Sequence, residues 1–257
     1  MRKSIAEKLR QIYGRLYAAY GPQHWWPADS PFEVVVGAIL TQSAAWVNVE
    51  KAIESLRAAG ILSPEALLRV DLDELARLIY PAGYYNAKAR KLKAFLEMLF
   101  DRHSGRLDAL FALPLPQLRQ ELLATHGIGQ ETADAIVLYA AEKPAFVIDA
   151  YTRRVFPRLG LEPPSDSYPS WQAMFSEALP PRRAVVQRVP CPDRPPCQGR
   201  LPQGAALRPV LPAGHLPPGD GLHFALTPLS GGTMLVAIWI WASLAFPFAA
   251  RPPSSTP

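Results

Sequence analysis

Two glycines flank one aliphatic residue in the segment His126-Gly127-Ile128-Gly129. Glycine adopts a positive φ without penalty, so this pattern predicts a tight hairpin between two helices. The backbone N–H groups of such a hairpin, and of the helix that follows it, can bind a DNA phosphate without any sequence preference. The alternative is an ordinary connection between two helices of a bundle.

A carboxylate stands about twenty residues after this hairpin, where Asp149 follows the apolar stretch Pro144 to Ile148. In a purely structural role it caps the next helix, which stabilises a helix by about 1 kcal/mol. In a chemical role, a carboxylate beside a cleft can activate water, or balance the positive charge that develops on a sugar as its base departs. Both roles are compatible with the sequence.

These two patches resemble the endonuclease III superfamily of helix-hairpin-helix (HhH-GPD) DNA glycosylases. The resemblance implies that Gly127, Ile128 and Gly129 bind DNA and that Asp149 is the catalytic acid. In bifunctional members, a lysine two residues after the second hairpin glycine forms a Schiff base with the sugar and cuts the strand. Glu131 occupies that position here, and a carboxylate cannot form an imine. We therefore expect a monofunctional glycosylase without lyase activity.

A third patch, from His24 to Ile53, contains aromatic or flat residues that could hold a flipped base: Trp25, Trp26, Pro27 and Trp46. Aromatic faces bind a base by stacking, and the cation–π attraction favours a cationic alkylated base. The arrangement is similar to the 3-methyladenine glycosylase branch of the superfamily, which implies an alkylated purine as the substrate. The alternative is that these tryptophans belong to the hydrophobic core.

Two further segments within the resemblance, which covers about residues 5 to 180, concern the DNA strand. Gln42 matches the residue that fills the hole left by the flipped base. The run from Tyr84 to Arg90 is similar to a helix start that lies near the DNA backbone. Lys88 and Arg90 are then expected to bind phosphates, or else to lie on a solvated helix face.

The elements that must position these residues are helices, because apolar residues recur at helical spacing and no sustained alternation indicates a strand. The spacing predicts helices over Ile5 to Tyr20, Pro31 to Thr41, Ala44 to Ala59, Pro64 to Val70, Leu72 to Tyr80, Asn86 to His103, Leu115 to Thr125, Gln130 to Ala141, Ala150 to Leu159 and Tyr168 to Ala178. The fold class is therefore all-α. The resemblance implies two lobes, a six-helix barrel with the hairpin over 31–143 and a terminal-helix lobe over 1–30 and 144–181.

The segment 182–257 differs in composition from the rest of the chain. Its seven arginines and two aspartates account for the whole formal charge of +5, and it holds 14 of the 28 prolines. We expect either a disordered tail or the product of a frameshift, since a one-base shift permits cysteines at positions 201, 207, 210 and 216. The apolar run Met234 to Ala250 is at the short limit for a membrane span and is interrupted by Pro247, so no membrane anchor is expected.

Cofactor and partner expectations follow from the same residues. Many superfamily members carry a [4Fe-4S] cluster on four cysteines, but this chain has only Cys191 and Cys197, so no cofactor or metal is expected. The charged N-terminus lacks the apolar core of a secretory signal, which favours the cytoplasm, with nucleoid association on DNA. We expect a monomer that acts on double-stranded DNA containing a damaged base. The alternatives are a non-catalytic DNA-binding module and a glycosylase for oxidised pyrimidines or mismatched thymine.

Overall fold

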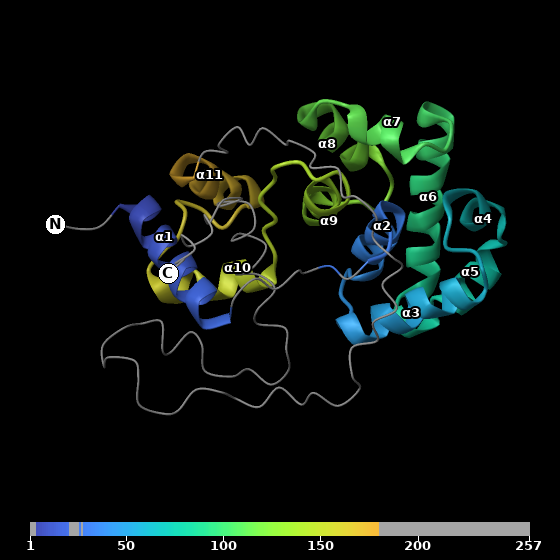
Figure 1. Cartoon of the computed structure of the whole chain (residues 1–257), viewed down its shortest axis with the longest axis horizontal. Coiled ribbons are helices and arrows are strands. Elements are labelled where there is room, and N and C mark those ends of the chain that lie inside the picture. Colours follow the sequence, from blue (N-terminus) through green and yellow to red (C-terminus); the bar gives the residue numbers. More distant parts are fainter. Residues whose placement is uncertain (1–3, 21–25, 27, 180–257) are drawn as a thin grey trace, which may run out of the picture.

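The computed structural model describes residues 4–20, 26 and 28–179, and within these ranges all regular structure is helical (Figure 1). The α-helices are α1 (Ile5–Tyr20), α2 (Pro31–Leu40), α3 (Trp46–Ala58), α4 (Pro64–Arg69), α5 (Leu72–Leu78), α6 (Tyr85–His103), α7 (Leu107–Ala112), α8 (Leu115–Ala124), α9 (Gln130–Ala135), α10 (Ala150–Val155) and α11 (Tyr168–Ala178). Short 3-10 turns lie at Tyr80–Ala82 and Pro157–Leu159, and a π-helical turn, Ile136–Ala140, continues α9. The all-α prediction is confirmed.

Helix α2 lies at the centre of the larger group of helices because its sequence, PFEVVVGAIL, is apolar on every side. All its residues from Phe32 to Leu40 are buried. Ser30 caps the helix by accepting a hydrogen bond from the backbone N–H of Glu33. The buried Glu33 carboxylate is in turn bound by Arg57 at 2.8 Å, so its charge is compensated.

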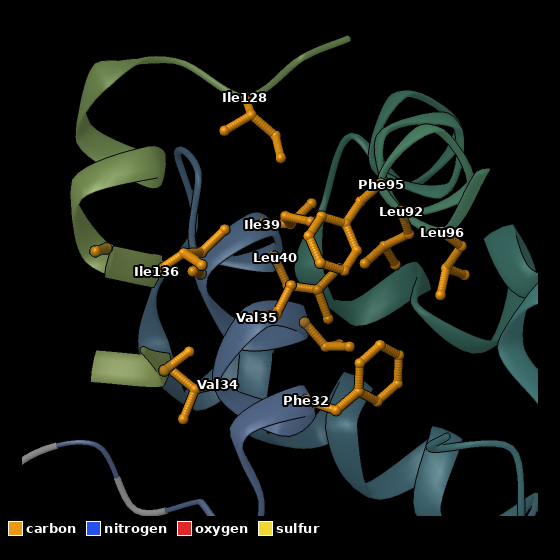
Figure 2. Packing of buried hydrophobic residues seen from close by; sticks show 14 of the residues in the cluster. Phe32, Val34, Val35, Ile39, Leu40, Leu92, Phe95, Leu96, Ile128 and Ile136 are labelled. Atoms are coloured by element: carbon orange, nitrogen blue, oxygen red, sulfur yellow. The ribbon is translucent and has the colours of Figure 1, made fainter. Parts of the chain in front are cut away.

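The described helices surround two separate clusters of buried apolar side chains. The larger cluster, part of which is seen in Figure 2, draws on α2, α3, α6 and the hairpin region. The smaller one consists of Leu9, Ile12, Ile148, Val155, Phe156, Leu161, Trp171, Met174 and Phe175. In Figure 1, α1, α10 and α11 accordingly gather on one side and α2 to α9 on the other.

The chain passes from one cluster to the other just before Asp149. Val147 is buried in the larger cluster and Ile148, its neighbour, is buried in the smaller one. Side chains of an extended segment alternate in direction, so two successive apolar residues can enter two different cores. This arrangement fixes Asp149 at the junction between the clusters. The boundaries of the predicted lobes themselves stay a prediction.

Several predicted helices differ from those observed. Helix α7, six residues long, was missed because so short a segment carries less than two turns of periodic pattern. The helix predicted over Ala150 to Leu159 is shorter in the structure, where α10 ends at Val155. Pro157, which begins the 3-10 turn, has no N–H to form the next α-helical hydrogen bond. The helix predicted from Gln130 to Ala141 changes at Ile136 from α- to π-helical.

No helix in the described part of the chain combines the length and the apolar character needed to cross a membrane. The tail 182–257, with its apolar run and the cysteine positions of the frameshift hypothesis, lies outside the described residues.

Candidate active site

Asp149 is the N-cap of α10, and its side chain is half-buried at the junction of the two clusters. Its Oδ1 accepts hydrogen bonds from the backbone N–H of Thr152 at 2.7 Å and from the Thr152 hydroxyl at 2.8 Å. No side chain of the described residues donates a hydrogen bond to its Oδ2. Burial raises the pKa of Asp149, and the two bonds from Thr152 oppose that shift. One oxygen thus holds the carboxyl in place while the other is left for chemistry.

Glu131, in the first turn of α9, belongs to the same site. Although the residue is exposed to solvent, the protein around its carboxyl and the charge of Asp149 together raise the pKa of Glu131 to about 7, against the lowering effect of Arg153. The two carboxyls are therefore close enough to influence each other. The sequence marked Glu131 only as the occupant of the lysine position, because pairing across twenty residues cannot be read from spacing.

The hairpin between α8 and α9 has the predicted glycine geometry at its first glycine. Gly127 has a φ of +80°, and a Cβ there would lie 2.3 Å from Cγ of Lys91, so the lysine side chain lies against the bare backbone. Ile128 is 5% exposed and directs its side chain into the larger cluster (Figure 2). Its N–H donates to Thr125 within the hairpin, and Gly129 has an ordinary φ of −88°. Ile128 therefore anchors the hairpin through its side chain.

Gln42, which follows α2, is tied to this hairpin. Its amide nitrogen donates to the carbonyl of Gly127 at 3.1 Å and to the hydroxyl of Thr132 at 2.8 Å. Its amide oxygen accepts a short hydrogen bond from Lys91. The structure thus brings the predicted hole-filling residue beside the predicted DNA-binding loop. Lys91 was not predicted to take part, although it is one helical turn from Lys88.

The predicted position of Lys88 on the surface is wrong. The side chain predicted to bind phosphate is 2% exposed, and its ammonium donates to the carbonyls of Leu40 at 2.8 Å and Ala82 at 2.7 Å. Burial, followed by the nearby charge of Lys91, lowers the pKa of Lys88 to about 8. Lys88 is therefore a buried cap for the carbonyl ends of two helical segments, and neither of its predicted alternatives holds. Arg90, two residues on, is exposed.

Three aromatic rings, those of Trp26, Trp46 and Tyr139, lie together, and Tyr139 is the one near Asp149. The ring of Trp26 packs on Tyr139 with centroids 4.9 Å apart and meets the edge of Trp46 at 5.6 Å. Burial, followed by the charge of Asp149, raises the pKa of Tyr139 well above its ordinary value, so the phenol lies within reach of the carboxylate's field. Trp26 and Trp46 are thus brought together, while Trp25 and Pro27 lie outside the described residues. Tyr139 was not predicted.

A polar network that the sequence did not reveal connects the hairpin side to α11. Asp134, fully buried in α9, accepts two hydrogen bonds from Arg119, at 2.7 and 3.1 Å. It also accepts hydrogen bonds from the Tyr168 hydroxyl at 2.8 Å and from the Gln172 amide at 3.0 Å. The Tyr168 hydroxyl accepts in turn from the N–H of Ile148 at 3.2 Å. The network therefore ends one residue before Asp149.

The residues present do not fit the four-cysteine cluster of many superfamily members. The chain has two cysteines, Cys191 and Cys197, and both lie outside the described residues. Within the described ranges no group of three or more His, Cys, Asp or Glu side chains is placed to hold a metal. Two cysteines are too few to supply the four thiolates of such a cluster.

The family model of the HhH-GPD superfamily base excision DNA repair proteins matches residues 36–181, more than half of the chain. The chain belongs to this superfamily. A candidate DNA repair glycosylase of Methanocaldococcus jannaschii is 42% identical over 182 residues, which cover 70% of this chain and 82% of the relative. These findings confirm the resemblance and make the protein a DNA N-glycosylase of the endonuclease III type.

Two solved structures are similar to the whole helical part. The 3-methyladenine DNA glycosylase of H. pylori, bound to 1,N6-ethenoadenine, has a TM-score of 0.59 and 27% identity, covering 68% of this chain and 81% of its own. A non-covalent endonuclease III–DNA complex has a TM-score of 0.59 and 25% identity, with coverages of 69% and 79%. The predicted helix-hairpin-helix glycosylase fold is confirmed.

Proposed function

We propose that this HhH-GPD glycosylase is a monofunctional enzyme that removes an alkylated purine from double-stranded DNA, with Asp149 as the catalytic carboxylate. The observation that carries the proposal is that the two oxygens of the Asp149 carboxyl have different surroundings. Oδ1 is fixed by two bonds from Thr152, and no side chain of the described residues donates to Oδ2. A carboxylate held in this way loses little entropy when it acts on a bound substrate.

In the proposed reaction the damaged base is flipped out of the helix and its glycosidic bond breaks by hydrolysis. Asp149, as the carboxylate, stabilises the positive charge that develops on the sugar and accepts a proton from the attacking water. The base leaves with the bonding electron pair, and the water oxygen bonds to C1′ of the sugar. The product is an abasic site in an uncut strand.

The absence of strand cleavage follows from the chemistry at position 131. A Schiff base requires an amine, and Glu131 offers a carboxyl. Lys91, whose side chain lies against the hairpin, is already engaged with Gln42, and the buried ammonium of Lys88 binds two carbonyls. The described residues therefore support base removal without a covalent enzyme–sugar intermediate.

DNA is the partner that the fold supports, since the endonuclease III structure to which the chain is similar is a DNA complex. We assign the strand contact to the hairpin at Gly127 and Gly129, with Lys91 supplying positive charge next to it. Gln42, held between Gly127 and Thr132, is the residue that would fill the gap left by the base. The protein is expected to act as a monomer.

An alkylated purine is the base that the aromatic surroundings favour. Trp26 and Trp46 meet at an angle of 75°, and Trp26 packs on Tyr139, whose hydroxyl is near enough to Asp149 for the charge of Asp149 to raise its pKa. Aromatic faces and nearby negative charge both attract the delocalised positive charge of an alkylated base. The similarity to the H. pylori 3-methyladenine glycosylase agrees with this choice.

The test is to incubate the full chain with duplexes that carry 3-methyladenine, thymine glycol or a G·T mismatch, and to treat half of each sample with alkali. We expect strand breaks only after alkali, and only with the alkylated base. Release of thymine glycol or thymine instead would overturn the alkylpurine specificity. Breaks before alkali would overturn the monofunctional mechanism, and no release from any duplex would leave a DNA-binding module without catalysis.

A further inference from the structure

The described part of the chain contains two buried side-chain polar atoms without a hydrogen-bond partner, Nε1 of Trp26 and the hydroxyl oxygen of Tyr139. Nearly all buried polar groups in proteins are hydrogen-bonded, and an unpaired one destabilises the folded state. Both atoms occur in side chains whose rings touch each other, with centroids 4.9 Å apart. Two unpaired polar atoms at one place indicate a site where a ligand supplies the missing hydrogen-bond acceptors.

Other side chains of the same type show that this protein does satisfy such groups elsewhere. Nε1 of Trp46 donates to Glu50 at 2.8 Å, and Nε1 of Trp171 donates to Asp166 at 2.7 Å. The hydroxyl of Tyr168 is bound to Asp134 at 2.8 Å. The missing partners of Trp26 and Tyr139 are therefore specific to the region beside Asp149.

Both residues are also held in unusual backbone conformations. Trp26 has a φ of +75°, a region that a bulky side chain rarely adopts, and Tyr139 lies in the π-helical turn Ile136–Ala140. Strained residues and π-helical turns are both common at functional sites. Gly37 makes room for the indole, because a Cβ there would lie 3.2 Å from Cζ2 and 3.4 Å from Nε1 of Trp26. The indole edge that carries the N–H is thus held in place by α2.

We infer that Trp26 and Tyr139 are specificity-determining residues, whose Nε1–H and O–H groups donate hydrogen bonds to acceptor atoms of the extracted base. This inference rests on the proposed base-removal function and adds a hydrogen-bonding element to the stacking described above. An indole N–H donates only, and the raised pKa of Tyr139 keeps its hydroxyl protonated and able to donate.

Two neighbouring donors select a base by the atoms on its edge. Guanine derivatives carry acceptors at both O6 and N7, whereas adenine derivatives carry the N7 acceptor beside a donor amino group. Among purines alkylated at N3, the pair of donors therefore favours 3-methylguanine over 3-methyladenine. A base that lacks one of these acceptors leaves a buried donor unpaired, and the site then discriminates strongly against that base.

The test compares Tyr139→Phe and Trp26→Phe with the wild type, because each variant keeps an aromatic ring and loses one donor. Tyr80→Phe is the control, since it removes a hydroxyl from an exposed ring. The substrates are duplex DNA treated with dimethyl sulfate, whose released bases are separated by chromatography, and duplexes with hypoxanthine, thymine glycol or a G·T mismatch. Single-turnover release, duplex affinity and melting temperature are measured for each protein.

We expect wild type to release 3-methylguanine faster than 3-methyladenine, and either variant to release the preferred base about tenfold more slowly and with less preference. Duplex affinity should stay the same. The melting temperature of Tyr139→Phe should be unchanged or higher by roughly 2 to 4 °C, since an unpaired buried group is removed, whereas that of Trp26→Phe should be lower, since the smaller ring leaves a cavity. Release by both variants within twofold of wild type, or a loss of activity in Tyr139→Phe together with a lower melting temperature, would overturn the inference. A wild-type protein that releases no base overturns the proposed function as well, whereas release that ignores both substitutions overturns this inference alone.

Discussion

The hydroxyl of Tyr168 on α11 donates to Oδ2 of Asp134 on α9 at 2.8 Å and accepts from the N–H of Ile148 at 3.2 Å. One oxygen atom thus connects a buried carboxylate beside the hairpin to the residue that precedes Asp149. Arg119 binds the same carboxylate from α8, and this bond raises the pKa of Arg119. The network holds the three elements in one arrangement, and it gives Asp149 a fixed backbone on its N-terminal side.

Replacement of Tyr168 by Phe should therefore affect both stability and catalysis. The ring is kept, but the Ile148 N–H loses a partner, so the free energy of unfolding should fall by about 1 to 3 kcal/mol. Base release should slow while duplex affinity stays the same, because the hairpin is untouched. Chemical unfolding and single-turnover release measure the two effects, with Tyr80→Phe as the matched control at an exposed ring. Equal effects of the two substitutions would contradict the role of the network.

The two hairpin glycines should respond differently to alanine. At Gly127 a Cβ would collide with the Lys91 side chain and the φ of +80° would be strained, whereas nothing lies within 4 Å of a Cβ at Gly129 and its φ is ordinary. Gly127→Ala should unfold about 1 to 3 kcal/mol more easily and bind duplex DNA more weakly, because Lys91 and Gln42 are displaced with the loop. Gly129→Ala is the control for stability. A Gly127→Ala protein as stable as the Gly129→Ala protein would disprove the strained geometry.

Glu131 decides whether the enzyme can cut the strand. Glu131→Lys places an amine at the position that forms a Schiff base in the bifunctional relatives, beside the carboxylate that assists the reaction. Borohydride should then trap a covalent protein–DNA product with the lysine variant, and trap none with wild type or Glu131→Gln. The assay is a shift of labelled damaged duplex on a denaturing gel. Trapping by the wild-type protein would show that another amine performs the reaction.

The raised pKa of Glu131 also predicts a dependence of stability on pH. Its ordinary value is 4.5 and its value in the folded protein is about 7, so the folded state favours the protonated carboxyl. Its contribution to stability is therefore largest below pH 4.5 and is lost as the pH rises to 7. Compared with Glu131→Gln, wild type should lose on the order of 1 kcal/mol over this interval, since solvent screens an exposed carboxylate. Urea unfolding at several pH values checks this, and parallel profiles would refute it.

Much of the fold could be predicted because its signals are local. The apolar periodicity of α1, α6 and α11 fixed their type and approximate limits, and Gly127 marked the hairpin by its need for a positive φ. The identity of Asp149 as a cap was also visible, because capping depends on residues within three positions along the chain. Short elements such as α7 carry too few residues for a periodic signal.

Relationships between distant residues could not be predicted in the same way. Lys88 was predicted to bind phosphate or to lie on a solvated helix face, and only the carbonyls of Leu40 and Ala82 explain why its burial is possible here. Tyr139 and Tyr168 stand in apolar or ordinary contexts in the sequence, and their roles depend on which helices come together. A tyrosine on an otherwise apolar turn, as in Ile136–Ala140, was the one available signal for Tyr139.

The central claim is that one carboxylate carries the chemistry, and Asp149→Asn tests it most directly. Asparagine is as good a helix cap as aspartate, so the fold and duplex affinity should be retained. Single-turnover release of the damaged base, measured beside the melting temperature and the duplex affinity, should fall by about 10²- to 10⁴-fold. Undiminished release by a variant that folds and binds duplex DNA normally would contradict the account.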